Sequence, residues 1–221
     1  PGYETAKNII WLANSVGQFI NADSQIREKL RLVFVPNYNV SWAELIIPAT
    51  EVSEQISTAG YEASGTGNMK FAMNGALTIG TLDGANVEMK DNIGEENMFL
   101  FGLHADQVEA TKRAGYDARQ IYFADRMVRG AIDAVQRGTF NPDDPGRFHG
   151  MMDALLNHDT FLVLADFRSY AACQTVVEQA YRDQSNWTRK SILNVSRMGF
   201  FSSDRTIASY GQEIWGVKSL R

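Results

Sequence analysis

The stretch Tyr61-Glu-Ala-Ser-Gly-Thr-Gly-Asn-Met-Lys-Phe71 is the most informative part of this chain. Its centre, Ser64–Gly67, offers consecutive backbone N–H groups and two hydroxyls, and residues 68–73 are compatible with one or two turns of helix. A helix begins with N–H donors that have no partner and with a partial positive charge, so its start attracts anions. Lys70 follows Thr66 by about one helical turn and can reach a ligand held at the same helix end. The stretch therefore predicts an anion-binding loop that carries a lysine.

Two kinds of ligand suit such a loop, namely pyridoxal phosphate and a nucleotide phosphate. Lysine forms Schiff bases when burial lowers its pKa. The P-loop pattern G-x-x-x-x-G-K-[ST] is absent. Gly65, Gly67 and Lys70 form G-x-G-x-x-K, which places a large side chain where the dinucleotide-binding motif needs a glycine. Glu62, before the loop, could accept a hydrogen bond from a sugar hydroxyl. From the residues alone, a tight turn with an exposed lysine is an equally good interpretation.

Short runs of β-forming residues surround this stretch. Residues 31–35 are apolar and stop at Pro36, and residues 51–57 alternate apolar and polar side chains. Two further candidates, Leu77–Gly80 and Met98–Phe101, each end at or next to a glycine. Strands that alternate with helices predict an α/β fold with a Rossmann-like parallel sheet. We expect Leu32–Val35 and the last two runs to lie parallel in one sheet, with helices on both faces.

Glycines are concentrated around the same strands and the lysine loop. They are Gly60, Gly65, Gly67, Gly75, Gly80, Gly84, Gly94 and Gly102. Glycine-rich loops at strand ends let the backbone approach a ligand closely, and ligands of open α/β sheets bind at that edge.

The remainder of the chain has helical periodicity. Apolar residues recur at helical spacing from Ala6 to Ile20, and from about residue 105 onward one helical pattern follows another. The expected helices of that half are 124–137, 148–156, 167–181, 187–198 and 204–215. The last has a candidate N-cap at Ser202 or Ser203. We therefore expect an α/β portion at 1–103 and a mostly helical portion at 104–221.

Composition excludes several classes of function. The chain has 221 residues and a formal net charge of -5, which argues against a nucleic-acid surface or a polybasic membrane patch. No apolar run approaches the roughly 20 residues of a membrane span. Cys173 is the only cysteine, and the three histidines are far apart, so we expect a reducing, cytoplasmic setting and no metal site. The chain starts at Pro1 within a few residues of a helical pattern, which predicts a piece of a larger protein.

The run Glu54-Gln-Ile-Ser-Thr-Ala-Gly-Tyr-Glu-Ala-Ser-Gly-Thr-Gly-Asn-Met-Lys70 resembles the pyridoxal-phosphate attachment motif of the α-glucan (glycogen, starch or maltodextrin) phosphorylases. The resemblance continues through Asn74-Gly-Ala-Leu-Thr-Ile-Gly-Thr-Leu-Asp-Gly-Ala-Asn-Val-Glu88. Further matches follow along nearly the whole chain. They are 94–97, 187–188, 201–206 and 210–215.

The resemblance implies an activity and an architecture. These enzymes cleave the terminal α-1,4 bond of a glucan with inorganic phosphate and release glucose 1-phosphate. Their GT-B fold pairs two Rossmann-like domains, and this chain is similar to the later part of the second. The first domain would then be missing from this chain, and the full-length enzyme could be a homodimer.

The resemblance also assigns roles to single residues. Lys70 is implied to form the Schiff base with pyridoxal phosphate. Gly65, Thr66 and Gly67 are implied to hold the cofactor phosphate, and Tyr38 to line its site. The stretch that matches the glucosyl-binding segment consists of Glu62, Ala63, Ser64 and Gly65.

Two features depart from an active phosphorylase site. Some family members carry arginine at the position of Asn39. In addition, Lys70 is the only lysine or arginine between residues 36 and 88, whereas two adjacent phosphates need surrounding cations. We therefore expect residues 1–221 alone to be inactive and to hold the cofactor weakly or not at all.

Two other functions remain as alternatives, a non-catalytic module of the same fold and a nucleotide-sugar glycosyltransferase domain. Asp83 and Glu88 could be read as the paired carboxylates of a glycoside hydrolase. We interpret Asp83-Gly84 as a turn and Glu88 as a structural residue, because no second pair supports hydrolysis.

Overall fold

The computed structural model describes residues 2–217, which fall into two compact units. Within the described residues, the first unit comprises residues 2–39 and 113–167, and the second comprises residues 40–112 and 168–217. Helix α9 (Val163–Arg182) contributes its first turn to the first unit and the rest to the second.

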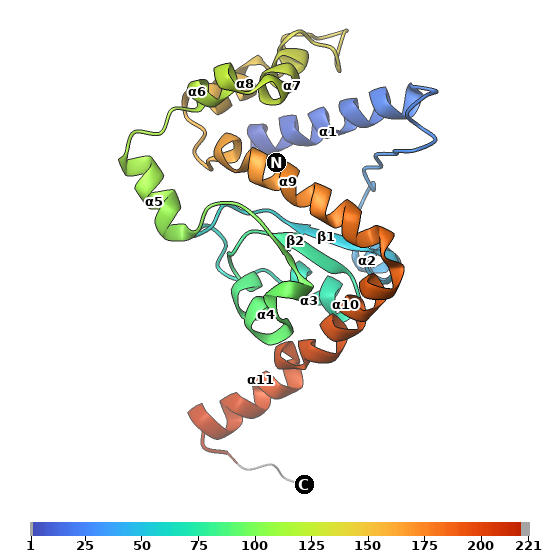
Figure 1. The fold of residues 1–221 in the computed structure, drawn as a ribbon, viewed down its shortest axis with the longest axis vertical. Coiled ribbons are helices and arrows are strands. Elements are labelled where there is room, and N and C mark those ends of the chain that lie inside the picture. The colour runs from blue at the N-terminus through green and yellow to red at the C-terminus, as the bar shows by residue number, and fades with distance from the viewer. Residues whose placement is uncertain (1, 218–221) are drawn as a thin grey trace. The chain divides into compact units, whose positions relative to one another are not determined.

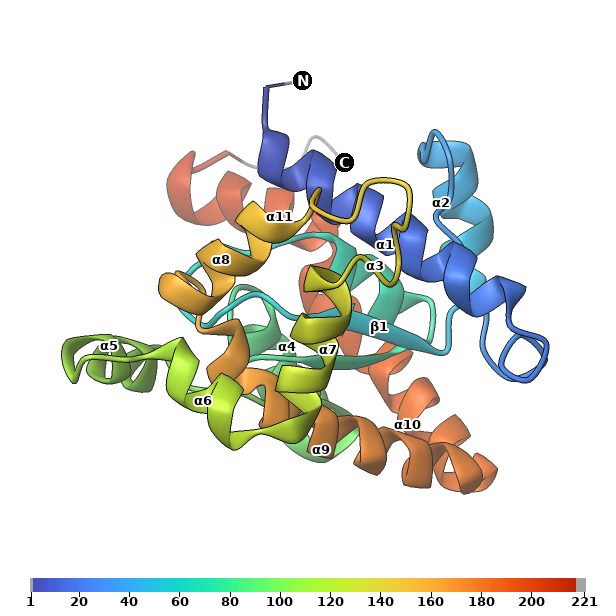
Figure 2. The same cartoon turned by 90° about the horizontal axis from the view of Figure 1, so that it is seen from above.

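The first unit is helical. It contains α1 (Glu4–Ala22), α6 (Ala118–Ala124), α7 (Arg126–Gln136) and α8 (His149–Asn157). The core of this unit is apolar and includes Ile132, Phe148 and Met152. Both views show α7 and α8 next to α1, and Leu12 of α1 packs against that core (Figures 1 and 2).

The second unit contains a three-stranded sheet of β1 (Val52–Gln55), β2 (Leu77–Gly80) and β3 (Phe99–Leu100). All pairs are parallel, in the order β1-β2-β3. Val52 pairs with Leu77, and Ile79 pairs with Phe99. The α/β class with a parallel sheet is therefore confirmed, with β2 at its predicted bounds and β3 shorter than predicted.

Helices connect and cover these strands. The connections contain α3 (Gly67–Met73) between β1 and β2, and α4 (Asn86–Ile93) with the 3-10 turn Glu95–Asn97 between β2 and β3. In Figure 1, α9 lies on one side of the strands, and α3 and α4 lie on the other. Leu77 and Ile79 of β2 pack against Val177 of α9, while Ala72 of α3 packs with Met89 of α4.

The other elements of the second unit are mostly helical. Before the sheet lie α2 (Val40–Ile46) and the 3-10 turn Ile47–Ala49. After β3 come α5 (Ala105–Arg113), whose last residue belongs to the first unit, α10 (Gln184–Arg197), the 3-10 turn Met198–Phe201, α11 (Ser203–Ser209) and the π-helix Tyr210–Ile214. Ser202 is the N-cap residue of α11, although its side chain makes no capping hydrogen bond.

One predicted strand is wrong. Residues 31–35 have no regular secondary structure. The side chain of Asn21 occupies both backbone groups of Leu32, accepting from its N–H at 3.1 Å and donating to its carbonyl oxygen at 2.8 Å. A strand would need those groups for its ladder. Val33 is 73% exposed, so apolar composition here does not correspond to burial in a sheet.

Candidate functional site

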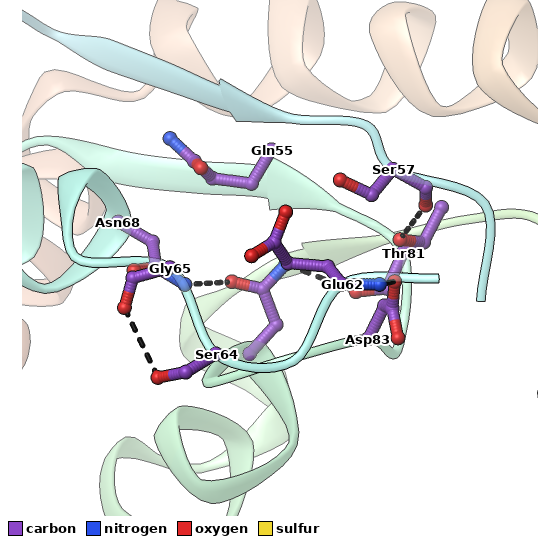
Figure 3. Close-up of a pocket in the computed structure, with 9 residues that line it drawn as sticks. Gln55, Ser57, Glu62, Ser64, Gly65, Asn68, Thr81 and Asp83 are labelled. Atoms are coloured by element: carbon purple, nitrogen blue, oxygen red, sulfur yellow. Dashed lines mark hydrogen bonds between the residues drawn. The ribbon is translucent and has the colours of Figure 1, made fainter. Parts of the chain in front are cut away.

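The candidate site lies at the carboxyl edge of the sheet, where the loop after β1 meets the turn after β2. Ligands of open α/β sheets bind at this edge. The two segments enclose a small polar pocket (Figure 3). It is lined by Gln55, Ser57, Glu62, Ser64, Gly65, Asn68, Thr81, Asp83 and Asn86.

Asp83 anchors the loop through both of its carboxylate oxygens. The backbone N–H of Gly60 donates to Oδ1 at 2.9 Å, and the N–H of Glu62 donates to Oδ2 at 2.8 Å. The side chain of Asp83 is only 7% exposed, so solvent competes little for these bonds. The turn interpretation of Asp83 missed this contact, because its partners lie more than twenty residues upstream.

One backbone bond and one side-chain bond extend the anchor on either side. The N–H of Ala85 donates to the Ser64 carbonyl oxygen at 2.7 Å, and the Thr81 hydroxyl donates to the Ser57 carbonyl oxygen at 2.5 Å. The loop is thus fixed to the turn after β2 near its start, its middle and its end.

Glycine is required at Gly84 by the closeness of this contact. Its φ is +50°, and a Cβ atom there would lie 2.5 Å from the Ser64 carbonyl oxygen and 3.0 Å from Cγ of Glu62. A side chain at this position would push the loop away from the turn.

A buried pair of amides joins the start of α3 to the start of α4. Asn68 donates from Nδ2 to Oδ1 of Asn86 at 3.0 Å, and Asn86 donates in turn to the Thr81 carbonyl oxygen at 3.0 Å. Oδ1 of Asn68 accepts the N–H of Met69 at 2.9 Å. This network fixes the start of α3 relative to the pocket.

The predicted site residues are divided between two cavities. Glu62, Ser64 and Gly65 line the polar pocket, and the Glu62 carboxylate extends into it near Gln55 (Figure 3). Thr66 and Lys70 instead line a larger, mostly apolar groove beside Met69 and Met73 of α3. The far wall of that groove is formed by Val195, Met198, Gly199, Phe201, Ser202 and Ser203.

The start of α3 can donate further hydrogen bonds from its backbone N–H groups. Thr66 is the N-cap residue, and its side chain makes no capping bond. Among the described residues, the N–H groups of Gly67 and Asn68 have no hydrogen-bond acceptor. Lys70 is exposed, one turn further along. Ala63 is an exposed residue of the loop between Glu62 and Ser64.

Tyr38 and Asn39 belong to the first unit, whereas the loop and α3 belong to the second. Tyr38 is 58% exposed. The side chain of Asn39 donates to the Asn37 carbonyl oxygen at 3.0 Å.

The structure brings one further cation to the loop. Lys112 of α5 donates a hydrogen bond to the Tyr61 hydroxyl and lies over its ring, 4.7 Å from the ring centre. Lys112 lies outside the range 36–88, in which Lys70 is the only lysine or arginine, because α5 follows the sheet in sequence. Within residues 2–217, no group of three His, Cys, Asp or Glu side chains could hold a metal ion, and no helix is long and apolar enough to span a membrane.

Comparisons with a family model and with curated proteins identify the same family. The sequence model of a family described as "Carbohydrate phosphorylase" matches residues 1–217. The chain is 52% identical over 220 residues to a glycogen phosphorylase of Synechocystis sp., covering 100% of this chain and 26% of that protein. It is 51% identical over 218 residues to the brain form of glycogen phosphorylase from Mus musculus, covering 99% and 26% of the two chains. A glycogen phosphorylase of Haemophilus influenzae is 49% identical over 219 residues, covering 99% and 27%. The chain thus spans about a quarter of the length of the curated relatives it matches.

Proposed function

Because this chain belongs to the carbohydrate phosphorylase family, we propose that it is part of an enzyme that cleaves terminal α-1,4-glucosidic bonds of glycogen or maltodextrin with inorganic phosphate, releasing glucose 1-phosphate. One observation carries the proposal. The run from Glu62 to Lys70, which resembles the family's cofactor-attachment motif, folds at the carboxyl edge of a parallel sheet. The Rossmann-like sheet would belong to the second domain of a GT-B enzyme.

The polar pocket is the proposed glucosyl-binding site. The Glu62 carboxylate accepts hydrogen bonds only, so it suits the hydroxyl groups of a sugar. Backbone groups of Ala63, Ser64 and Gly65 add donors and acceptors on the same loop. Because Asp83, Ala85 and Thr81 fix this loop, the acceptors are ordered before the sugar arrives, which lowers the entropic cost of binding.

Pyridoxal phosphate is the proposed cofactor, attached at Lys70. The donor set fits it, because the exposed amine of Lys70 lies one turn from the N–H groups of Gly67 and Asn68 that have no acceptor among the described residues. Gly65, Thr66 and Gly67 would hold its phosphate, and Tyr38 is proposed to line its site, as the resemblance to the family implies. When bound, the cofactor supplies a phosphate group that acts beside the substrate phosphate in proton transfer.

Cations for the two phosphates are proposed to come from the rest of the enzyme. Two phosphate groups in contact repel each other strongly unless positive groups surround them. Lys112 is engaged with Tyr61, and Lys70 would be bonded to the cofactor. We therefore expect an additional N-terminal domain to complete the cleft, and the 221 residues alone to be inactive and to hold the cofactor weakly. We further propose that the full-length enzyme is a cytoplasmic homodimer.

The test is an assay of glucose 1-phosphate release from maltooligosaccharide and phosphate, with pyridoxal phosphate added. The full-length protein should turn over, and residues 1–221 should not. A full-length protein without phosphorolysis would contradict the proposed activity. Turnover by residues 1–221 alone would contradict only the claim that other segments supply the phosphate-binding cations.

A further inference from the structure

We propose that Asp83 is a positioning residue for the reaction, which holds the glucosyl-binding loop in the geometry that presents Glu62 and Ser64. This inference rests on the proposed function. It concerns a side chain on the turn after β2, outside the loop itself, and it assigns to that side chain a role beyond forming a turn.

Asp83 holds the loop by two hydrogen bonds, which together are called the Asp83 clamp. Its two carboxylate oxygens accept the N–H groups of Gly60 and Glu62, which are separated by one residue. Both bonds are charge-assisted and are shielded from solvent by the burial of Asp83. Because the N–H of Glu62 is one end of this clamp, any shift of the Asp83 side chain moves the backbone from which the Glu62 carboxylate extends.

The neighbouring residues of the turn reinforce the same position. Gly84 allows the turn to approach within van der Waals distance of Ser64 and Glu62, and Ala85 donates to the Ser64 carbonyl oxygen. Glu62 and Ser64 are themselves exposed, so packing alone does not fix their backbone. The two hydrogen bonds of the Asp83 clamp therefore fix the backbone of this loop.

Asparagine at position 83 is the informative substitution. The amide of Asp83→Asn has one oxygen acceptor and one NH2 donor, whereas two backbone N–H groups require acceptors. One of the two loop bonds is then replaced by a contact between donors, with almost no change of volume. The matched control is Asp91→Asn on α4, which removes the same charge from an exposed position.

Activity is measured in the full-length enzyme loaded with cofactor. We expect kcat/KM for maltooligosaccharide to fall by about tenfold to a hundredfold in Asp83→Asn, since small misplacements of substrate-positioning groups have effects of that size. Bound pyridoxal phosphate should stay at the wild-type amount, because Thr66 and Lys70 line a different cavity. Asp91→Asn should match the wild type in both measurements.

Hydrogen exchange of the wild-type enzyme tests the clamp independently of activity and of any variant. The amides of Gly60 and Glu62 should exchange slowly although both residues are exposed, and in Asp83→Asn at least one should exchange faster while strand β2 is unchanged. If Asp83→Asn does not fold, Gly84→Ala displaces the same loop by contact with Ser64 and should show the same loss of kcat/KM.

Two results would overturn the inference. One is fast exchange of both amides in the wild type. The other is a kcat/KM in Asp83→Asn or in folded Gly84→Ala equal to that of Asp91→Asn. A wild-type enzyme that does not release glucose 1-phosphate would instead contradict the proposed function.

Discussion

The side chains of Asn68 and Asn86 form a hydrogen bond of 3.0 Å, although both residues are almost completely buried. They come from the first turns of α3 and α4, which follow neighbouring strands of the sheet. Asn86 also donates to the Thr81 carbonyl oxygen. A single buried amide therefore connects the helix that carries Lys70 to the turn that carries Asp83.

Removing this amide should destabilise the protein. Asn86→Ala leaves the buried amide NH2 of Asn68 without its acceptor, which costs about 1–3 kcal/mol, while the Thr81 carbonyl oxygen keeps the backbone N–H of Asp83 as a donor. Urea denaturation of the 221-residue protein measures the change. Asn92→Ala, on the same helix but partly exposed, should change the unfolding free energy by no more than about 0.5 kcal/mol. Equal effects of the two substitutions would contradict the role of the buried pair.

Two glycines should respond to alanine in opposite directions. A Cβ atom on Gly80 would lie 2.7 Å from the Gln55 carbonyl oxygen and 2.7 Å from Nδ2 of Asn86, so Gly80→Ala should destabilise by about 1–3 kcal/mol. Gly130 lies exposed within α7 with open space around it. Gly130→Ala should stabilise by up to about 1 kcal/mol. Thermal unfolding of both variants checks the signs, and destabilisation by Gly130→Ala would show that the α7 surface is not open.

Stability should decrease at alkaline pH because of Tyr116. Burial, and then the hydrogen bond that its hydroxyl donates to Oδ2 of Asp159 at 2.6 Å, raise the pKa of Tyr116 above its ordinary value. In the unfolded chain this tyrosine ionises near pH 10, whereas in the folded chain it keeps its proton to higher pH. The stabilising contribution is thus complete below about pH 10 and is lost as the pH rises through the raised pKa.

The comparison of wild type with Tyr116→Phe isolates this effect. Denaturation between about pH 8 and pH 11 should show a steeper loss of unfolding free energy for the wild type than for the variant, because phenylalanine does not titrate. Parallel curves for the two proteins would contradict the assignment.

Loss of the Glu62 charge should impair use of the glucan. Glu62→Gln replaces a charged acceptor in the polar pocket by a neutral amide, and a hydrogen bond to a charged group contributes about 1.5–3 kcal/mol. We expect kcat/KM of the full-length enzyme to fall by roughly tenfold to a hundredfold. Glu88→Gln, exposed on α4, is the control and should retain wild-type kinetics. A Glu62→Gln enzyme as active as the control would exclude the pocket as the glucosyl site.

The sequence predicts elements well where local pattern and burial agree. Leu77–Gly80 is buried along its whole length and ends in glycine, and it forms β2 at the predicted bounds. The run at 31–35 has similar composition but was wrong as a strand, because a side chain eleven residues upstream occupies the backbone of Leu32. Composition does not reveal such a partner.

The candidate site shows the same limit. The loop from Glu62 to Lys70 carries its own signal in its glycines and its lysine, and it was predicted from the sequence. Asp83 contacts the loop only because the strands pair in parallel. Lys112 contacts it only because α5 folds back towards the loop. Their roles depend on tertiary contacts, which no local spacing encodes.

The proposed attachment of pyridoxal phosphate at Lys70 underlies the phosphorylase activity proposed for the full-length enzyme. Borohydride reduction of the full-length enzyme, followed by peptide mapping, tests it most directly, because reduction makes the link between lysine and pyridoxal phosphate permanent. We predict one labelled peptide, with the pyridoxyl group on Lys70, and no label in Lys70→Ala. A label on another lysine, or an unlabelled enzyme that still releases glucose 1-phosphate, would contradict the attachment of the cofactor at Lys70.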